Sequence, residues 1–137
     1  MIDPRALIAA RSVGEIRYAV AYESTSDLSR VLSEFGLLPD KSLLVEHDRD
    51  SSHAILTTLL WKDMAYEDEC MPRHQAESLA QQILDEHALP GAKYFSNCNV
   101  AKEKNWNPLT ESTFDAGLVI INEVSHIHFC IWFQDED

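Results

Sequence analysis

The residues best suited to chemistry lie near the end of the chain, in the segment HIHFCIWF. His126 and His128 form an H-x-H pair, and Cys130 follows on the same face of an expected strand. A zinc site would need a fourth ligand at close range. Because same-face residues lie ~6.5–7 Å apart along a strand, Cys130 would be stretched away from an ion held by both histidines. We therefore expect no metal or cofactor. The alternative is a small metal-dependent or hydrolytic enzyme that uses His126, His128 and nearby acids.

Other reactive side chains do not form a recognisable catalytic motif. Cys98 lies in a polar segment, SNCN, that matches no protease or redox signature. Asp115 lies in TFDAG, where a carboxylate commonly accepts backbone N–H groups at a turn, so a structural role is expected. The chain has four glycines, and none stands at the spacing of a G-x-G-x-x-G phosphate loop. We predict a protein that is not an enzyme and has no catalytic residue.

Acidic residues beside aromatic ones form the second candidate site. The segment DMAYEDE, residues 63–69, carries four acids around Tyr66, and Trp132 stands close to three acids at the chain end. Exposed aromatic anchors within a charged rim are typical of protein interfaces. The alternatives are aromatic side chains in the core and acids that merely face solvent. The predicted partner-binding residues are Asp63, Tyr66, Glu67, Asp68, Glu69, Trp132, Asp135, Glu136 and Asp137.

The overall charge narrows the choice of partner. The chain has 137 residues, with 23 acids against 11 bases and a formal net charge of −12. Nucleic acids and anionic lipids are bound by Lys and Arg that replace counterions, so direct contact with either is not expected. The acidity serves solubility or attracts a basic partner protein. The absence of a long apolar run, the lack of an evident signal peptide and three widely spaced cysteines predict a cytoplasmic protein without a membrane span.

One domain spanning residues 1–137 is expected to position these side chains. With 45 % hydrophobic residues, a chain of this length buries roughly 65–70 % of its unfolded surface, enough for a core without metal or disulfide support. Apolar spacing and capping residues predict helices over residues 3–11, 27–35, 53–61 and 73–87, with Ser26 as the cap of the second. Strands are expected over residues 16–22, 43–45 and 93–95; the alternative is a continued helix over residues 15–23 and an extended segment over residues 43–45.

The last quarter of the chain predicts a β-hairpin. Gly117–Ile121 is a short apolar run typical of a buried strand, and residues 122–125 supply a loop of hairpin length. In the second strand, Ile127, Phe129, Ile131 and Phe133 form one face, which we expect in the core. The opposite, semi-polar face is either covered by a helix or left partly wet. The predicted fold is α+β, with a mostly antiparallel sheet, helices packed on one face and a C-terminal β-hairpin.

Several segments together resemble a known family. They are LLWKDMAYEDECM at residues 59–71, YFSN at residues 94–97, WNPLTESTFDAGLVII at residues 106–121 and the terminal IWFQDED. This pattern resembles small bacterial immunity proteins of contact-dependent growth inhibition and other polymorphic toxin systems. The resemblance covers about residues 55–137, and its most specific pieces are Pro108–Thr110, Thr113–Gly117 and Trp132 with the terminal acids.

The resemblance implies binding rather than catalysis. A protein of this kind binds a cognate toxin domain, often a nuclease, in the cytoplasm and blocks its active site or an essential surface. The partner would be basic where it meets nucleic acid. Acidic side chains would then occupy phosphate positions, and aromatic side chains would supply the desolvated centre of the interface.

Overall fold

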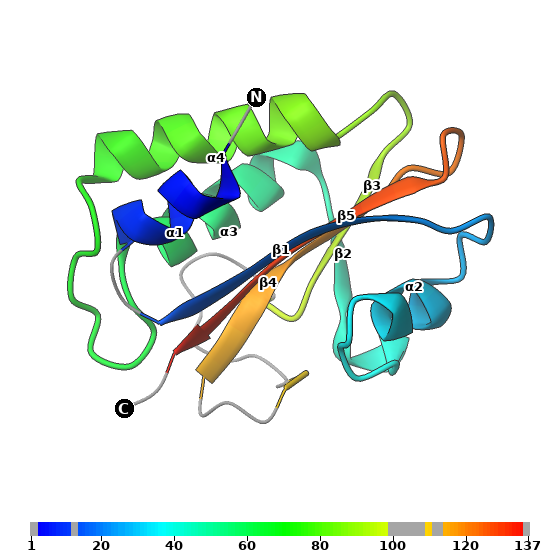
Figure 1. The fold of residues 1–137 in the computed structure, drawn as a ribbon, viewed down its shortest axis with the longest axis horizontal. Coiled ribbons are helices and arrows are strands. Elements are labelled where there is room, and N and C mark those ends of the chain that lie inside the picture. Colours follow the sequence, from blue (N-terminus) through cyan, green and yellow to red (C-terminus); the bar gives the residue numbers. More distant parts are fainter. Residues whose placement is uncertain (1–2, 12–13, 99–108, 111–113, 136–137) are drawn as a thin grey trace.

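One antiparallel sheet runs through the centre of the structure (Figure 1). The computed structural model describes residues 3–11, 14–98, 109–110 and 114–135. Within these ranges, the sheet has five strands in the order β1-β5-β4-β3-β2, and each neighbouring pair is antiparallel. The strands are β1 (Glu15–Tyr22), β2 (Val45–His47), β3 (Lys93–Ser96), β4 (Phe114–Ile121) and β5 (Ile127–Asp135). The long strand β1 and the short strand β2 therefore form the two edges.

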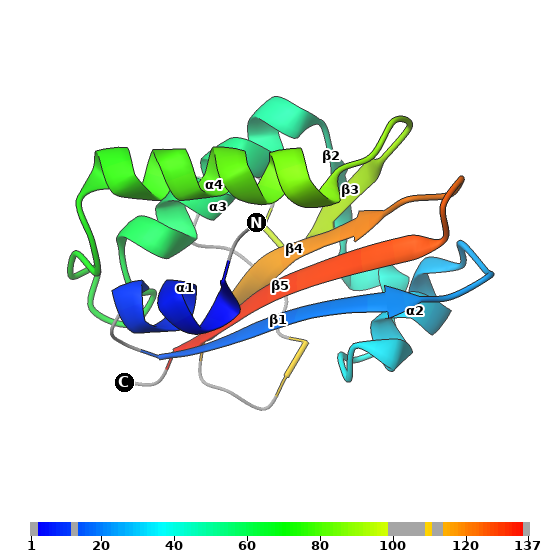
Figure 2. The same cartoon turned by 45° about the horizontal axis from the view of Figure 1, so that its top comes forward.

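Helices pack against this sheet. They are α1 (Pro4–Arg11), α2 (Leu28–Glu34), α3 (Arg49–Trp61) and α4 (Arg73–His87), with a short 3₁₀ turn, η1 (Lys41–Leu43). The helices α1, α3 and α4 lie over one face of the sheet (Figure 2). The short α2 packs at the opposite face, beside η1. The predicted α+β class with a mostly antiparallel sheet and a C-terminal hairpin, β4–β5, is confirmed.

Local chemistry sets where the helices begin and end. Asp48 caps α3 with its side chain, so this helix begins four residues before the predicted His53. The cap of α2 is Asp27 and not the predicted Ser26, because the Asp27 carboxylate accepts the free backbone N–H of the first turn. Gly36 follows α2 with φ +72°, a left-handed conformation that ends a helix at little cost for glycine.

Strand β5 is buried on both faces. Phe129, Ile131 and Phe133 pack toward α3 and α4, as predicted. On the other face, Cys130 and Trp132 pack toward α2, so the face expected to be semi-polar is covered. The prediction that Ile127 is core is wrong: its side chain is 46 % exposed, because it lies at the end of β5 beyond the helices. A central strand covered on both sides explains its long apolar run.

The β4–β5 turn is held by one polar side chain. Asn122 donates through Nδ2 to the backbone oxygens of His87 and Ile127, and its Oδ1 accepts from the backbone N–H of Leu89. The turn is one residue longer than predicted and includes His126, whose φ is +61°. His126 therefore does not belong to the strand, as the H-x-H interpretation required. The same bonds fix the end of α4 against the hairpin.

Candidate functional site

The acidic turn, residues 63–69, connects α3 to α4 and is closed by backbone hydrogen bonds. Cys70 N–H donates to the carbonyl of Trp61 at 2.7 Å, and Lys62 forms an antiparallel bridge with Glu69. Inside the turn, Glu67 N–H donates to the carbonyl of Asp63 at 3.2 Å. The segment is therefore a tight, hydrogen-bonded turn.

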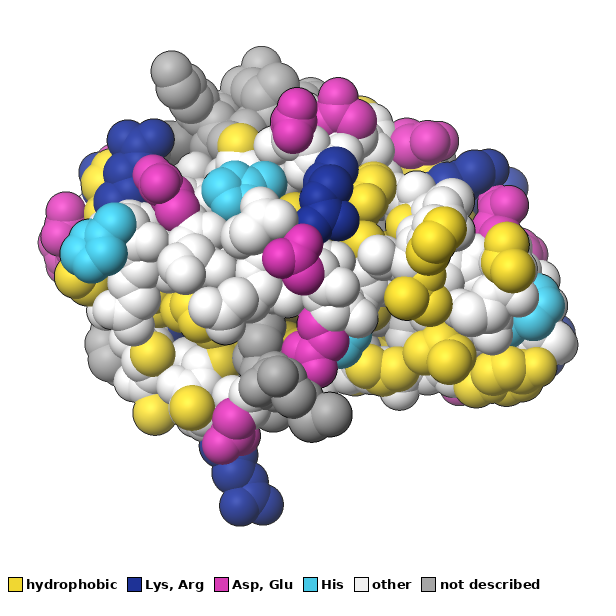
Figure 3. Space-filling model, turned by 90° about the horizontal axis from the view of Figure 1, so that it is seen from above, with side chains coloured by type: hydrophobic (Ala, Val, Ile, Leu, Met, Phe, Trp, Pro, Cys, Tyr) yellow, Lys and Arg dark blue, Asp and Glu magenta, His cyan; other side chains and the backbone are white. Residues whose placement is uncertain are grey.

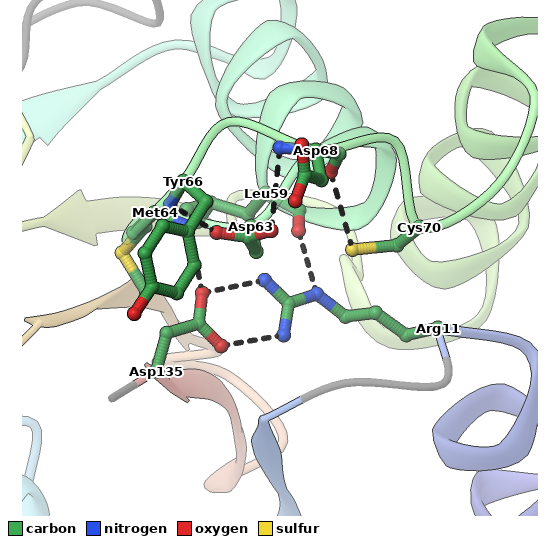
Figure 4. Close-up of polar contacts among 8 residues, drawn as sticks. All are labelled: Arg11, Leu59, Asp63, Met64, Tyr66, Asp68, Cys70 and Asp135. Atoms are coloured by element: carbon green, nitrogen blue, oxygen red, sulfur yellow. Dashed lines mark hydrogen bonds and ion pairs between the residues drawn. The ribbon is translucent and has the colours of Figure 1, made fainter. Parts of the chain in front are cut away.

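Asp63 organises this turn from within (Figure 4). Its carboxylate accepts the backbone N–H of Tyr66 at 2.5 Å and that of Asp68 at 3.3 Å. Asp63 is consequently buried, which contradicts its predicted place on a partner-facing surface. An aspartate that accepts backbone N–H groups a few residues ahead is a common turn-forming device. The role of Asp63 is to shape the turn.

The outer side of the turn carries the remaining predicted residues. Tyr66 is 65 % exposed, and Glu67, Asp68 and Glu69 are exposed beside it. Glu67 has φ +58°, so the backbone reverses sharply at this point. The structure thus places one aromatic ring and three carboxylates together at the surface, as the sequence predicted for this segment.

Trp61 borders the acidic turn and was not singled out from the sequence. The Lys62 ammonium lies 4.2 Å from the centre of a Trp61 ring, and the Arg73 guanidinium lies 5.1 Å from a ring centre. Both distances are those of cation–π contacts. Two cations next to the indole keep this part of the surface from being purely acidic. In the sequence, Trp61 simply ends the apolar stripe of a predicted helix, which gave no sign that it would contact two cations beside the acidic turn.

A buried ion pair ties the acidic turn to the rest of the fold. Arg11 and Asp135 form two hydrogen bonds of 2.8 Å, and both side chains are inaccessible to solvent (Figure 4). Arg11 Nε also donates to the carbonyl of Leu59 at 2.8 Å, and Asp135 Oδ2 accepts the backbone N–H of Met64 at 2.9 Å. The pair therefore joins α1, the end of α3, the acidic turn and β5.

Asp135 was predicted to face a partner, and the structure contradicts this because Asp135 is buried. The sequence suggested a solvated acidic tail, since its last residues are DED. Strand β5 instead continues to Asp135, and its alternation turns this side chain toward Arg11. Glu136 and Asp137 lie outside the described residues.

Trp132 is also inside the protein, with no exposed surface, which contradicts its predicted role as an interface anchor. Its indole N–H donates to Asp115 Oδ1 at 3.1 Å. The same carboxylate accepts the backbone N–H groups of Leu109 and Thr110 at 2.9–3.1 Å and the Thr110 hydroxyl at 2.7 Å. The structural role predicted for Asp115 is confirmed, because it anchors residues 109–110 against β4 and β5.

The histidines of the enzymatic alternative are engaged elsewhere. His128 is buried, its Nδ1 accepts the backbone N–H of Asn122 at 3.1 Å, and its Nε2 faces the carbonyls of Glu23 and Thr25 at 3.1 and 3.2 Å. Metal binding would have to break these bonds. His126 packs edge-on against Tyr22. Among the described residues, no three His, Cys, Asp or Glu side chains form a group able to hold a metal ion.

The cysteines lack the setting of a nucleophile. Cys98 and Cys130 are buried, and burial raises their thiol pKa values to about 11 and about 12. Burial likewise raises the pKa of the partly exposed Cys70 thiol, and the nearby Arg11 only partly offsets this. Reactive cysteines have a lowered pKa and solvent access. Cys98 and Cys130 therefore pack as thiols in the interior, and Cys70 does so at the edge of the interior.

A second group of titratable side chains lies at the other end of α4. The Tyr18 hydroxyl and His87 Nε2 are 2.5 Å apart, and the His87 ring stacks on Phe129 at 3.9 Å between centroids. Burial lowers the pKa of His87, while burial and then the charge of Glu86 raise the pKa of Tyr18. His87 lies at the end of α4 opposite the acidic turn, about 21 Å along the helix from Arg73. It joins α4 to β1 and β5.

Comparisons with protein-family models, curated proteins and solved structures found no match to this chain. The described residues include no helix with the length and apolar character needed to cross a membrane.

Proposed function

We propose that this chain is an immunity-type protein that binds and neutralises a cognate bacterial toxin domain through the acidic turn. One observation carries the proposal. Tyr66 stands out in solvent beside three exposed carboxylates, on a backbone that Asp63 and Asp135 hold in place. The resemblance of residues 55–137 to immunity proteins points the same way.

The rigidity of the turn supports a role in tight binding. A loop that orders only on binding lowers affinity, because the lost conformational freedom opposes association. Here the backbone of Met64 and Tyr66 is already fixed by buried or turn-forming carboxylates. Tyrosine is a frequent energetic centre of interfaces, since its ring is large and loses little side-chain entropy. Tyr66 is thus suited to enter a pocket on the partner.

The charge of the turn supports a basic partner. Glu67, Asp68 and Glu69 present contiguous carboxylates on a chain whose net charge is −12. A positively charged partner would be steered toward this surface, which raises its association rate. A nuclease toxin offers such a surface where it binds phosphates. The carboxylates would then stand in for phosphate groups and block access to nucleic acid in the cytoplasm, where the toxin acts.

The test uses the C-terminal domain of the protein encoded by the neighbouring reading frame. In one variant, Glu67, Asp68 and Glu69 are all replaced by lysine. The control variant replaces three exposed acids elsewhere, Glu34, Glu46 and Asp50, by lysine, so that both variants change the net charge equally.

Association is measured by stopped flow at several salt concentrations. We expect the acidic-turn variant to associate at least about tenfold more slowly at low salt and to lose most of its salt dependence, with little change in the control. Tyr66→Ala should weaken the complex by about 2 kcal/mol, or roughly 30-fold in Kd, chiefly through faster dissociation. Failure of the wild-type chain to bind this domain, or equal effects of the two lysine variants, would overturn the proposal.

A further inference from the structure

The free edge of β1 is an unusually open sheet edge. β1 is eight residues long and pairs within the described sheet only with β5, whereas the opposite edge strand, β2, has three residues. Natural edge strands are commonly protected by lysine, proline, a bulge or short length. The second half of β1, YAVAY at residues 18–22, has no charged residue and no proline, and its register with β5 is unbroken. Nothing in this segment discourages another strand from pairing.

The hydrogen-bond pattern shows which backbone groups face outward. Glu23 N–H donates to the carbonyl of His126 at 3.0 Å, next to the pair Tyr22–Ile127. Pairs that exchange hydrogen bonds alternate with pairs that do not in an antiparallel ladder. The odd-numbered residues of β1 therefore bond to β5. The N–H and C=O groups of Tyr18, Val20 and Tyr22 point to the free edge.

Exposed apolar side chains lie beside this edge. Val20 and Tyr22 are 51 % and 70 % exposed, and Ile127, which pairs with Tyr22, is also exposed. Val124, at the tip of the β4–β5 turn, is 86 % exposed. Figure 3 shows hydrophobic side chains gathered at this end of the molecule, beyond the end of α4. We call Val20, Tyr22, Val124 and Ile127 the edge patch.

We propose that β1 pairs with β1 of a second copy of this chain, antiparallel and two-fold symmetric about Val20, so that the two sheets become one. The register follows from charge. With Val20 opposite its own copy, Arg17 lies opposite Glu23 of the second copy, on the face that carries α2. Glu23 already pairs with Arg30 of its own chain at 3.7 Å, so Arg17 of the second copy would add a second cation beside this carboxylate. Arg17 is already held on that face by the carbonyls of Phe35 and Gly36.

Other symmetric registers are less favourable. Centring the pair on Ala19 would place Glu15 opposite Glu23, and like charges directly opposite are destabilising. Centring it on Tyr18 would place Gly14 opposite Tyr22 and would leave Arg17 opposite an alanine. The register centred on Val20 also brings the outward-facing groups of Tyr18 and Tyr22 together as a hydrogen-bonded pair, and it merges the two edge patches.

The net charge of −12 does not prevent this association. The acidic turn is attached through Asp135, and β5 ends beside the first residue of β1, since Glu15 pairs with Gln134. Five residues of strand separate Glu15 from Val20, or about 17 Å. The Debye length is about 8 Å at physiological ionic strength, so the turn is largely screened from the dimer axis. The dimer leaves both acidic turns accessible, and it is independent of the proposed toxin binding.

The test measures mass and backbone protection on the purified full chain. Sedimentation equilibrium from micromolar to submillimolar concentration should show the mass rising from 15.6 kDa toward twice that value. Val20→Lys should remain a monomer. The matched control is Val45→Lys, which places the same charge on the opposite edge strand and should still dimerise, because Val45 is also exposed. In hydrogen exchange, the amides of Tyr18, Val20 and Tyr22 should become protected as concentration rises.

A cross-link tests the register itself. Val20→Cys should form a disulfide-linked dimer under mild oxidation, because hydrogen-bonded antiparallel pairs have Cα atoms about 5.5 Å apart, within disulfide range. Val45→Cys carries the same native Cys70 and serves as the control. A wild-type chain that stays at 15.6 kDa with rapidly exchanging outward amides overturns the proposal. Dimerisation that survives Val20→Lys, or equal cross-linking of the two cysteine variants, overturns it as well.

Discussion

Replacing Asp135 by alanine removes one half of a fully buried ion pair and leaves the other half intact. The Arg11 guanidinium would keep its hydrogen bond to the carbonyl of Leu59 but would lose both bonds to the carboxylate. Met64 N–H would lose its acceptor at the same time. The variant must therefore bury a guanidinium without its carboxylate partner or open the structure around it.

The size of the effect follows from that burial. Breaking a buried pair from one side typically costs about 3–5 kcal/mol, a large fraction of the roughly 5–15 kcal/mol that stabilises a domain. For a chain of this length, 1 kcal/mol corresponds to about 3–4 °C in Tm, so a fall of roughly 9–20 °C is expected. The exposed pair between Arg49 and Asp85 provides the control, since Asp85→Ala should cost no more than about 1 kcal/mol.

Urea unfolding followed by tryptophan fluorescence measures these free energies. The series comprises Asp135→Ala, Arg11→Met and the double variant that carries both changes. The double variant should lose less stability than the two single changes added together, because no unpaired charge remains in the interior. Additive losses, or a loss below about 1 kcal/mol for Asp135→Ala, would refute the view that the buried pair couples α1, β5 and the acidic turn.

Three further predictions concern the core and the pH response. Asp115→Ala should lower the free energy of unfolding by about 3 kcal/mol or more, because it leaves several buried donors, including the Trp132 indole N–H, without an acceptor. Urea unfolding measures this loss. Gly117→Ala should be comparably harmful in thermal melts, since a Cβ there would lie 2.2 Å from a backbone oxygen. Burial lowers the pKa of His87, so the neutral ring is favoured in the folded state. Its stabilising contribution is therefore complete above about pH 6.5 and is lost as pH falls. Between pH 7 and 5, the stability of His87→Gln should fall less steeply than that of the exposed control His74→Gln.

Much of the secondary structure could be predicted because it follows from local rules. Helix α4 occupies residues 73–87 as predicted, since its apolar stripe and the flanking prolines are all contained in the segment. The alternation in β1 and β5 and the short apolar run in β4 marked these strands in the same way. Helix α3 begins earlier than predicted because the Asp48 side chain accepts the backbone N–H of Ser51 and so caps the helix at this point.

The acidic turn shows how far local reasoning reaches toward the candidate site. The cluster of acids around Tyr66 was visible in the sequence, and the structure exposes Tyr66, Glu67, Asp68 and Glu69. The burial of the Asp63 side chain was not predicted, since the sequence does not distinguish an aspartate that faces solvent from one that accepts backbone N–H groups. Only the formed turn brings those donors to its carboxylate.

The sequence by itself determined the helices, the strands and their alternating faces, because spacing along the chain decides which side chains share a face. Tertiary structure decided which of those faces is covered. Both faces of β5 are buried, so Trp132 lies in the core and Asp135 is turned inward. Arg11 stands 124 residues from Asp135, and no local pattern links them. They pair because β1 and β5 lie side by side, which brings Arg11 at the end of α1 next to Asp135 at the end of β5. A buried charge is stable only when it is paired and hydrogen-bonded.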